Sequence, residues 1–320
     1  MNAARSGIRR NTASRGASIS THADTRRRCI TWERLVGYAA DTMRSIQFRP
    51  ASFGAVCLVA AAAIAVAEST NAQSAPKPMT GILLEDLTWQ QAERVLTPNA
   101  VVVIPLGAAS KEHGPHLRLK NDFVLAEYFT RRVMAREAVV VAPTINYHFY
   151  PAFVEYPGST SLRLETARDL VVDVCHSLAK FGPKRFYILN TGVSTVRALK
   201  PAQEQLAAEG IVMRFTDILT IGAEAEKAVR QEEGGTHADE IETSMMLYMD
   251  PSLVDMSKAA KDYHSDGSGP LTRDPDGKGV YSPTGIYGDA TLATREKGRR
   301  VVEAIVEGIL KEIDALRATR

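Results

Sequence analysis

Two histidines and two carboxylates lie within a stretch of eleven residues: Glu112, His113, His116 and Asp122. They directly follow the apolar run 100–107. Imidazole and carboxylate groups are the usual protein ligands of zinc, manganese and iron. The same residues could instead form a polar loop with two solvated histidines. So many metal-ligand side chains in so short a connection favour a metal site.

A second cluster surrounds His237 and contains Asp239, Glu240 and Glu242. Acids in the first turn of a helix also compensate the helix dipole, so this cluster has a purely structural explanation as well. The side chains of His237 and Glu242 converge only if residues 235–237 are still loop when the helix begins. In that arrangement Glu240 or Glu242 could act as a general base and His237 as a proton donor.

The elements that must position these clusters alternate along the chain. Short, nearly continuous apolar runs predict buried parallel strands at 101–106, 139–142, 185–190 and 211–216. Amphipathic patterns between and after them predict helices at 123–137, 165–181, 195–208, 223–232, 238–248 and 294–316. This alternation predicts a three-layer α/β/α sandwich with a mainly parallel central sheet. The first cluster then lies at the carboxyl edge of that sheet, where such folds bind ligands.

The segment 262–288 interrupts this alternation. It is rich in Gly, Pro, Asp and Ser, which favour turns. A loop of this length in a compact domain usually has a functional role.

Residues 52–67 are apolar and small, and Arg44 and Arg49 precede them. This pattern is typical of a signal peptide, with cleavage expected after Ala72 or, as a second choice, after Ala67. We therefore expect export to the periplasm or secretion, with no membrane attachment after cleavage. An uncleaved membrane anchor is the alternative.

Upstream of residue 43 the chain is rich in arginine and has no periodicity. A start at Met43 would leave residues 1–42 untranslated, and a long twin-arginine-like leader is the alternative. We divide the chain into a leader, 1–72, and a single domain, 73–320.

The positive charge belongs to the leader. Residues 1–72 contain ten Arg and four acids, a net charge of +6, whereas the whole chain carries +2, so the domain carries about −4. No nucleic-acid partner is therefore expected. Cys29 and Cys57 also lie in the leader, which leaves Cys175 alone in the domain and excludes an internal disulfide there.

The motifs, taken in order, resemble the creatininase family of creatinine amidohydrolases and relatives. They read IPLG at 104–107, EHGPHL at 112–117, ND at 121–122, PGSTSL at 157–162, HADEIETSMML at 237–247, GIYGDATLAT at 285–294 and EKG at 296–298. The resemblance implies an α/β/α sandwich that holds two divalent metals, hydrolyses cyclic or formyl amides and assembles as a homo-oligomer, commonly a hexamer.

The resemblance also implies residue roles. His113 and Asp122 match two metal ligands, with Asp122 bridging both ions, and His116 matches the second histidine of the family's H-G-P-H. His237 and Glu242 match a histidine and a glutamate near the substrate and metals.

Two departures from the family pattern reduce the expected ligand set. Lys111 stands where the family has a ligand glutamate two residues before the first histidine, and Glu112 is the acid nearest to that position. After the third strand, Gly192 stands where the family has another ligand histidine. A site with one ion, made from Glu112, His113, Asp122 and either His116 or His237, remains chemically adequate.

The segment 191–195 offers hydroxyl groups and backbone N–H groups at a strand end, which suit an anion or oxyanion. We expect Thr191, Ser194 and His148 to line the substrate pocket, although the aromatic residues around His148 would equally suit a core or a subunit contact. Ser194 has no G-x-S-x-G context, so the sequence does not favour a serine hydrolase.

These observations predict a metal-dependent hydrolase that acts on a non-peptide C–N bond, a cyclic or formyl amide of a small molecule, through a metal-activated water. One or two ions, zinc or manganese, are expected. The alternatives are a non-catalytic protein of creatininase fold, for binding or assembly, and a metal-dependent lyase or isomerase. The resemblance implies an aromatic lid in the enzymes that act on creatinine. Trp89 is the one tryptophan of the domain, so no such lid can be matched and creatinine itself is not the expected substrate.

Overall fold

The computed structural model describes residues 80–265 and 267–319. The leader lies outside the described residues, so the signal peptide at 52–67, its cleavage point and the start of translation stay predictions. The described residues belong to one compact unit. Within the described residues, no helix is long and apolar enough to cross a membrane.

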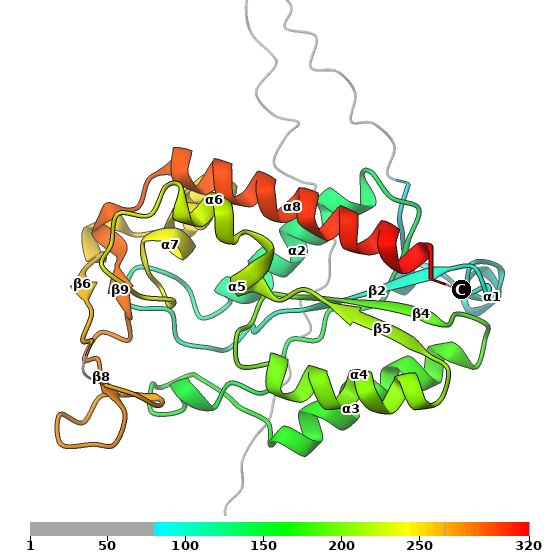
Figure 1. The fold of residues 1–320 in the computed structure, drawn as a ribbon, viewed down its shortest axis with the longest axis horizontal. Coiled ribbons are helices and arrows are strands. Elements are labelled where there is room, and N and C mark those ends of the chain that lie inside the picture. The colour runs from blue at the N-terminus through cyan, green and yellow to red at the C-terminus, as the bar shows by residue number, and fades with distance from the viewer. Residues whose placement is uncertain (1–79, 266, 320) are drawn as a thin grey trace, which may run out of the picture. The chain divides into compact units, whose positions relative to one another are not determined.

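Five parallel strands form the central sheet, in the order β1-β3-β2-β4-β5 (Figure 1). The predicted fold class is confirmed. The strands are β1 Ile82–Leu83, β2 Val101–Leu106, β3 Val140–Val141, β4 Arg185–Asn190 and β5 Val212–Phe215. The helices are α1 Trp89–Val95, α2 Asn121–Met134, α3 Leu164–Ala179, α4 Val196–Ala208, α5 Ile218–Ile221, α6 Ala223–Lys227, α7 Glu240–Met249 and α8 Arg295–Arg317.

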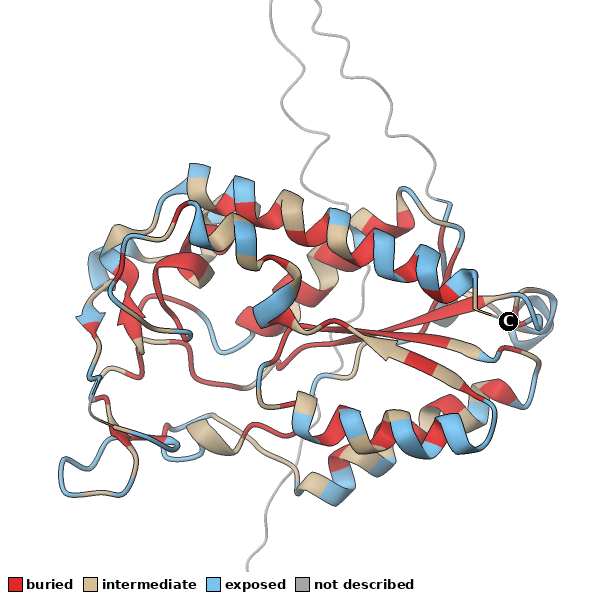
Figure 2. Cartoon of the chain, in the orientation of Figure 1, coloured by how far each residue is buried: buried red, intermediate tan, exposed pale blue. Residues whose placement is uncertain are grey.

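Each face of the sheet has its own apolar core, because successive side chains of a strand point to opposite faces. Val101 and Val103 of β2 pack with α2, α7 and α8, whereas Val102, Ile104 and Leu106 pack with α3 and α4. In Figure 2 β2 and β4 are accordingly buried over nearly their whole length between these helices. The core thus fixes the carboxyl ends of both strands, from which the site is built.

Strands β2 and β4 have the predicted bounds, whereas β3 and β5 are shorter than predicted. The sequence analysis missed β1, which has only two residues, and α1, which is exposed on most of its surface. The described part of the segment 262–288 is mostly loop, and it contributes to two short strand pairs, β6 Lys261–Asp262 with β9 Gly288–Asp289 and β7 Leu271–Thr272 with β8 Val280–Tyr281.

The start of α7 and the end of α6 differ from the predictions in a way that matters for the site. α7 begins at Glu240 instead of 238 because the Asp239 side chain accepts a hydrogen bond from the Glu242 backbone N–H. α6 ends at Lys227, five residues earlier than predicted, and the chain continues as loop to α7. Residues 235–237 are therefore non-helical, which is the condition under which His237 and Glu242 can converge.

Candidate metal centre and cavity

The loop from β2 to α2 carries the first cluster. A side chain at Gly107 would overlap the carbonyl oxygen of Asp122, so the start of α2 packs directly against the end of β2. The Phe123 backbone N–H closes this contact by donating to the Ala108 carbonyl, 3.1 Å away. Although Asp122 lies in the first turn of α2, neither it nor Asn121 caps that helix. The Asp122 carboxylate is therefore free to face the site.

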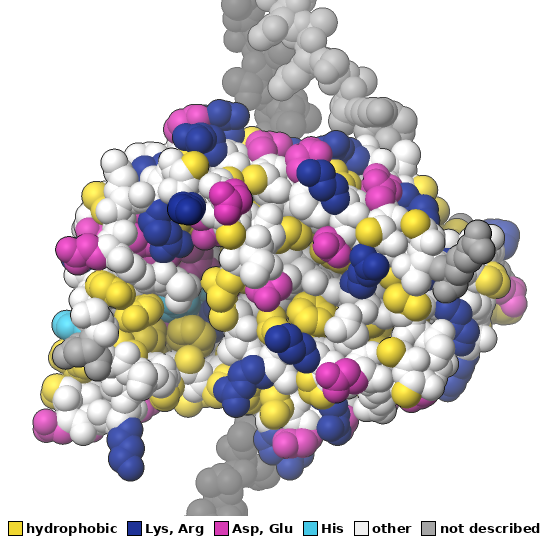
Figure 3. Space-filling view, viewed as in Figure 1, with side chains coloured by type: hydrophobic (Ala, Val, Ile, Leu, Met, Phe, Trp, Pro, Cys, Tyr) yellow, Lys and Arg dark blue, Asp and Glu magenta, His cyan; other side chains and the backbone are white. Residues whose placement is uncertain are grey.

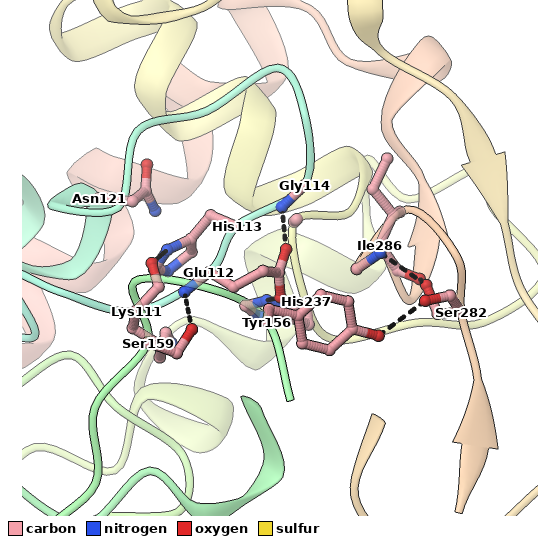
Figure 4. Close-up of polar contacts among 12 residues, drawn as sticks. Lys111, Glu112, His113, Gly114, Asn121, Tyr156, Ser159, His237, Ser282 and Ile286 are labelled. Atoms are coloured by element: carbon pink, nitrogen blue, oxygen red, sulfur yellow. Dashed lines mark hydrogen bonds and ion pairs between the residues drawn. The ribbon is translucent and has the colours of Figure 1, made fainter. Parts of the chain in front are cut away.

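The motif at 157–162 holds this loop from the side. The Ser159 hydroxyl accepts a hydrogen bond from the Glu112 backbone N–H at 2.9 Å, and the Ser110 hydroxyl donates to the Gly158 carbonyl at 2.6 Å. Figure 4 shows Ser159 beside Glu112, with His113 and His237 on either side of the Glu112 side chain. The role of this motif is thus to position the residues before His113.

A backbone bridge to the 285–294 motif positions His237. The His237 N–H donates to the Tyr287 carbonyl, and the Tyr287 N–H donates back to the His237 carbonyl at 2.9 Å. The next residue, Ala238, has φ of 49°, which lies in the left-handed region that non-glycine residues rarely adopt. Its N–H donates to Glu242 Oε2 at 2.7 Å. This strained turn brings His237 and Glu242 to the same place.

His113, His237 and Glu242 form a group whose potential ligand atoms all lie within 4.8 Å of one another. Both histidines are buried, and the Glu242 side chain is about 14% exposed. Two imidazoles and one carboxylate are a known donor set of catalytic zinc sites. The residues present therefore fit a single divalent ion.

The backbone fixes the orientation of the His113 ring. Its Nδ1 lies 2.9 Å from the Lys111 carbonyl oxygen, which can only accept, so Nδ1 carries a proton. Nε2 points at Asp122 Oδ1, 2.8 Å away, and at Glu242 Oε1, 3.4 Å away. Nε2 is therefore the nitrogen that would bind a metal ion once it has released its own proton.

The electrostatics of the metal-free group favour charged forms. Burial and the Lys111 ammonium lower the pKa of His113, but Asp122 and Glu242 more than offset them and raise it to about 9. Burial opposes ionisation of Glu242, yet the charge and hydrogen bond of His113, and then His237, hold the pKa of this carboxyl far below its usual range. Such an assembly of buried charges is typical of functional sites.

Two further carboxylates flank the group. Glu112 Oε2 lies 3.1 Å from His237 Nε2, and Glu112 Oε1 accepts a hydrogen bond from the Gly114 N–H. Asp122 is fully buried between His113 and the Lys111 ammonium, whose Nζ lies 2.7 Å from Asp122 Oδ2. The first predicted cluster thus lies beside the second, as the sequence led us to expect.

A cavity of about 400 Å³ opens onto these groups. Lys111, Asp122, His237 and Glu242 form part of its wall, and a larger apolar surface is contributed by side chains that include Leu125, Phe153, Val193, Ile218, Leu219, Met245, Leu271 and Val280. Figure 3 shows a hollow with hydrophobic side chains around it and histidine at its base. Mixed lining of this kind is typical of a pocket for a small organic molecule.

The structure does not bring three of the predicted residues into this cavity. Glu240 is fully buried elsewhere, where its carboxylate accepts from the backbone N–H groups of residues 231 and 232 and pairs with Lys297. His148 is buried against α3, and its Nε2 lies 3.0 Å from the Ala167 carbonyl. His116 lies 2.8 Å from the Thr243 hydroxyl and does not line the cavity wall. We therefore assign Glu240 and His148 to packing and no longer regard them as base and pocket residue.

Thr191 and Ser194 do line the cavity, but their hydroxyl groups already donate to backbone carbonyls. The Thr191 hydroxyl lies 2.9 Å from the Asp122 carbonyl, and the Ser194 hydroxyl lies 2.9 Å from the Phe149 carbonyl. They hold the site together more than they offer a ligand contact. Trp89, on α1, does not line the cavity.

Sequence reasoning missed two residues that contact the group. The Asn121 side chain donates to Glu242 Oε1 at 2.8 Å, and the Phe153 ring lies 4.2 Å from that of His237. Asn121 precedes Asp122 in the N-D motif, so its position was a usable signal. Phe153 ends a short 3₁₀ helix, Pro151–Phe153, whose sequence has no pattern that would single it out.

Comparisons with known proteins relate the chain to one family. The creatininase family model, described as creatinine amidohydrolase, matches residues 85–313. The chain is 28% identical to the creatinine amidohydrolase of Pseudomonas putida, over 72% of this chain and 96% of that protein. It is 27% identical to the mycofactocin precursor peptide peptidase of Mycobacterium ulcerans, over 66% and 84% respectively. A solved structure of creatininase with Mn has a TM-score of 0.63 at 24% identity, over 75% of this chain and 100% of that one.

Proposed function

Because the chain belongs to the creatininase family, we propose that this amidohydrolase-like enzyme cleaves a C–N bond with a divalent ion held by His113, His237 and Glu242. The observation that carries the proposal is the convergence of these three side chains, which come from the β2–α2 loop, the loop before α7 and the first turn of α7. His237 and Glu242 also line the cavity. Zinc and manganese both accept such a donor set. The creatininase structure with Mn supports the second of these.

When bound, such an ion polarises the carbonyl group of an amide and lowers the pKa of a coordinated water towards about 7. The residues of the chain supply orientation and proton transfer. The Lys111 carbonyl holds the His113 ring, and Glu112 contacts the His237 ring. Among the described residues, the Glu112 carboxylate has His237 as its one cationic partner within 4 Å. We assign to Glu112 the role of general base, which accepts a proton from the attacking water.

The substrate is a small amide whose reacting group reaches the polar wall while its remainder lies against the apolar one. The cavity volume, about 400 Å³, suits a cyclic or formyl amide with an apolar substituent. No tryptophan lines the cavity, which disfavours creatinine. The relatives named for creatinine and for a precursor peptide show that this fold serves more than one amide.

The test combines metal content with hydrolysis. Purified protein should retain a transition metal, and it should hydrolyse at least one of a panel of cyclic amides, N-formyl amino acids and short peptides. A chelator should abolish this activity, and Zn²⁺ or Mn²⁺ should restore it. Glu112→Gln should keep the metal and lower kcat by about 10²–10⁴. Less than about 0.2 equivalents of metal after growth in metal-replete medium would instead favour a non-catalytic binding protein.

We also propose that the mature protein is exported and forms a homo-oligomer. The apolar run 52–67 supports export, and the family resemblance supports assembly. Mass spectrometry of the N-terminus from the periplasmic fraction tests the first. Light scattering coupled to gel filtration tests the second, and a monomer at micromolar concentration would contradict it.

A further inference from the structure

We propose that the Lys111 ammonium takes the place of a second divalent ion beside Asp122. The centre then holds one exchangeable ion and, next to it, a positive charge built into the chain. This inference rests on the proposed metal centre, and the experiment below distinguishes failure of one from failure of the other.

The two carboxylate oxygens of Asp122 contact different partners. Oδ1 faces His113 Nε2 at 2.8 Å, on the side of the metal-binding group. Oδ2 faces Lys111 Nζ at 2.7 Å. A fully buried carboxylate requires a compensating positive charge. On the Oδ2 side that charge comes from lysine.

In the described part of the chain, the side chains that enclose the Lys111 ammonium offer no further ligand for a metal ion. Its ammonium lies 4.8 Å from the centre of the Phe153 ring and 5.6 Å from that of Tyr150, so two aromatic faces enclose it. Gly192 contributes no side chain there. A Cβ at this position would lie 2.8 Å from the Thr195 methyl group and 3.1 Å from the Tyr150 ring, so these two side chains fill that space.

Within residues 80–265 and 267–319, His113, His237 and Glu242 are the one group of three His, Cys, Asp or Glu side chains close enough to share an ion. A second ion on the Oδ2 side would have Asp122 as its main protein ligand. It would also have to displace a buried lysine, about 5% exposed, from its ion pair. Both features favour the lysine over the ion.

The consequence for chemistry is a fixed cation in the cavity wall. Lys111 and Asp122 both line the cavity, beside His237 and Glu242. An ammonium at this place can donate a hydrogen bond to an amide carbonyl oxygen and stabilise negative charge that develops on it. Unlike an ion, it cannot be removed by a chelator.

Metal stoichiometry tests the proposal. Full-length wild-type protein, K111E and K120E are stripped with a chelator, titrated with Zn²⁺ and dialysed, and the retained zinc is measured by mass spectrometry. Lys120 is exposed on the same loop, so K120E makes the same change of charge outside the centre. We expect one equivalent in the wild type and in K120E, and two equivalents in K111E. With two equivalents of Mn²⁺, K111E should also show the broadened electron paramagnetic resonance signal of neighbouring ions.

Two equivalents in the wild type would overturn this inference and leave the proposed hydrolase intact, whereas no retained metal would overturn both. One equivalent in K111E, or a second equivalent in K120E, would show that Lys111 does not set the stoichiometry. If K111E does not fold without metal, K111D replaces it. This variant also exchanges the ammonium for a carboxylate, which together with Asp122 offers a second ion two protein ligands, and we expect it to bind a second, weaker equivalent. A single equivalent in K111D overturns the inference as well.

Discussion

At the residue scale, Lys111 organises the centre through two different groups. Its carbonyl oxygen accepts from His113 Nδ1, and its ammonium binds Asp122. The imidazole and the carboxylate are thereby fixed relative to one another before any ligand arrives. Preorganised ligands of this kind need little rearrangement on binding, which favours both metal affinity and catalysis.

Glu242 and Glu240 should respond differently to the same substitution. Glu242→Gln removes a charged member of the candidate group, so we expect metal affinity to fall by at least about 100-fold. Glu240 lies two residues away on the same helix but contacts Lys297. Glu240→Gln should therefore keep the metal and lower only the thermal stability. Competition with a fluorescent chelator measures both affinities. Equal loss in the two variants would show that the ligand group is misassigned.

At the scale of elements, the packing of α7 against α8 carries the centre, because α7 supplies Glu242. Gly298 of α8 lies against the backbone of Ser244 of α7, where an added Cβ would overlap the Ser244 carbonyl oxygen. The adjacent Lys297 reaches over the start of α7 to Glu240. The two helices are therefore in backbone contact, and the position of the Glu242 carboxylate depends on it.

Gly298→Ala should destabilise the fold by about 2–3 kcal/mol, even though alanine favours helix formation by about 1 kcal/mol over glycine. The matched control is Gly308→Ala in the same helix. There the added methyl group meets chiefly the Ile221 side chain, which can shift, so the loss should be smaller. Urea denaturation measures both free energies of unfolding. An unchanged free energy of unfolding for Gly298→Ala would mean that the two helices can separate without cost.

The long buried strands and the long helices of this fold could be predicted, because their patterns extend over several turns or pleats. The two-residue strand β1 could not, since two apolar residues have no periodicity. Within the site, the order of motifs predicted that His113, Asp122, His237 and Glu242 lie together. The pairing of Lys111 with Asp122 depends on where a flexible side chain ends in space, which sequence spacing does not specify.

Glu240 and Glu242 both stayed open as general base, because both fall in the first turn of the predicted helix. The two residues point to different sides of α7, and sequence spacing does not specify that Glu242 faces the cavity while Glu240 faces Lys297. The Asp239 cap starts α7 two residues later than the pattern predicted, which leaves His237 in the loop, where it can meet Glu242.

At the scale of the whole molecule, the site joins segments from both halves of the chain. His113 follows β2, His237 and Glu242 lie more than 120 residues later, and Tyr287 fixes His237. An ion shared by His113, His237 and Glu242 would tie these segments together only in the folded state. Its binding free energy would then add to the free energy of unfolding.

Added Zn²⁺ or Mn²⁺ should therefore raise the melting temperature of stripped protein. At a concentration about 100 times the Kd, the gain is about 2.7 kcal/mol, which for a domain of this size corresponds to about 5–10 °C. His237→Ala should lose most of this shift, whereas Lys120→Glu, on the exposed part of the first loop, should keep it. Differential scanning fluorimetry provides the measurement. An equal shift in His237→Ala would place the ion elsewhere.

Stability should also depend on pH through Glu232, which links three segments around the site. Its carboxylate accepts from the backbone N–H groups of Asp289 and Glu240 and lies beside Asp239. Burial, and then the charge of Asp239, raise the pKa of Glu232 to about 8, even though Arg230 Nη1 lies 2.7 Å from its other oxygen.

Because the pKa of Glu232 is higher in the folded than in the unfolded protein, its contribution to stability is complete below about pH 4.5 and is lost as pH rises through about 8. Glu232→Gln keeps an acceptor for the two N–H groups but cannot lose a proton. Relative to this variant, the wild type should become progressively less stable between pH 5 and 9, because deprotonation then places a second negative charge next to Asp239. Melting temperatures of both proteins across this range give the difference directly. Parallel curves would mean that Glu232 is ionised in the folded protein throughout, with Arg230 outweighing the effect of burial.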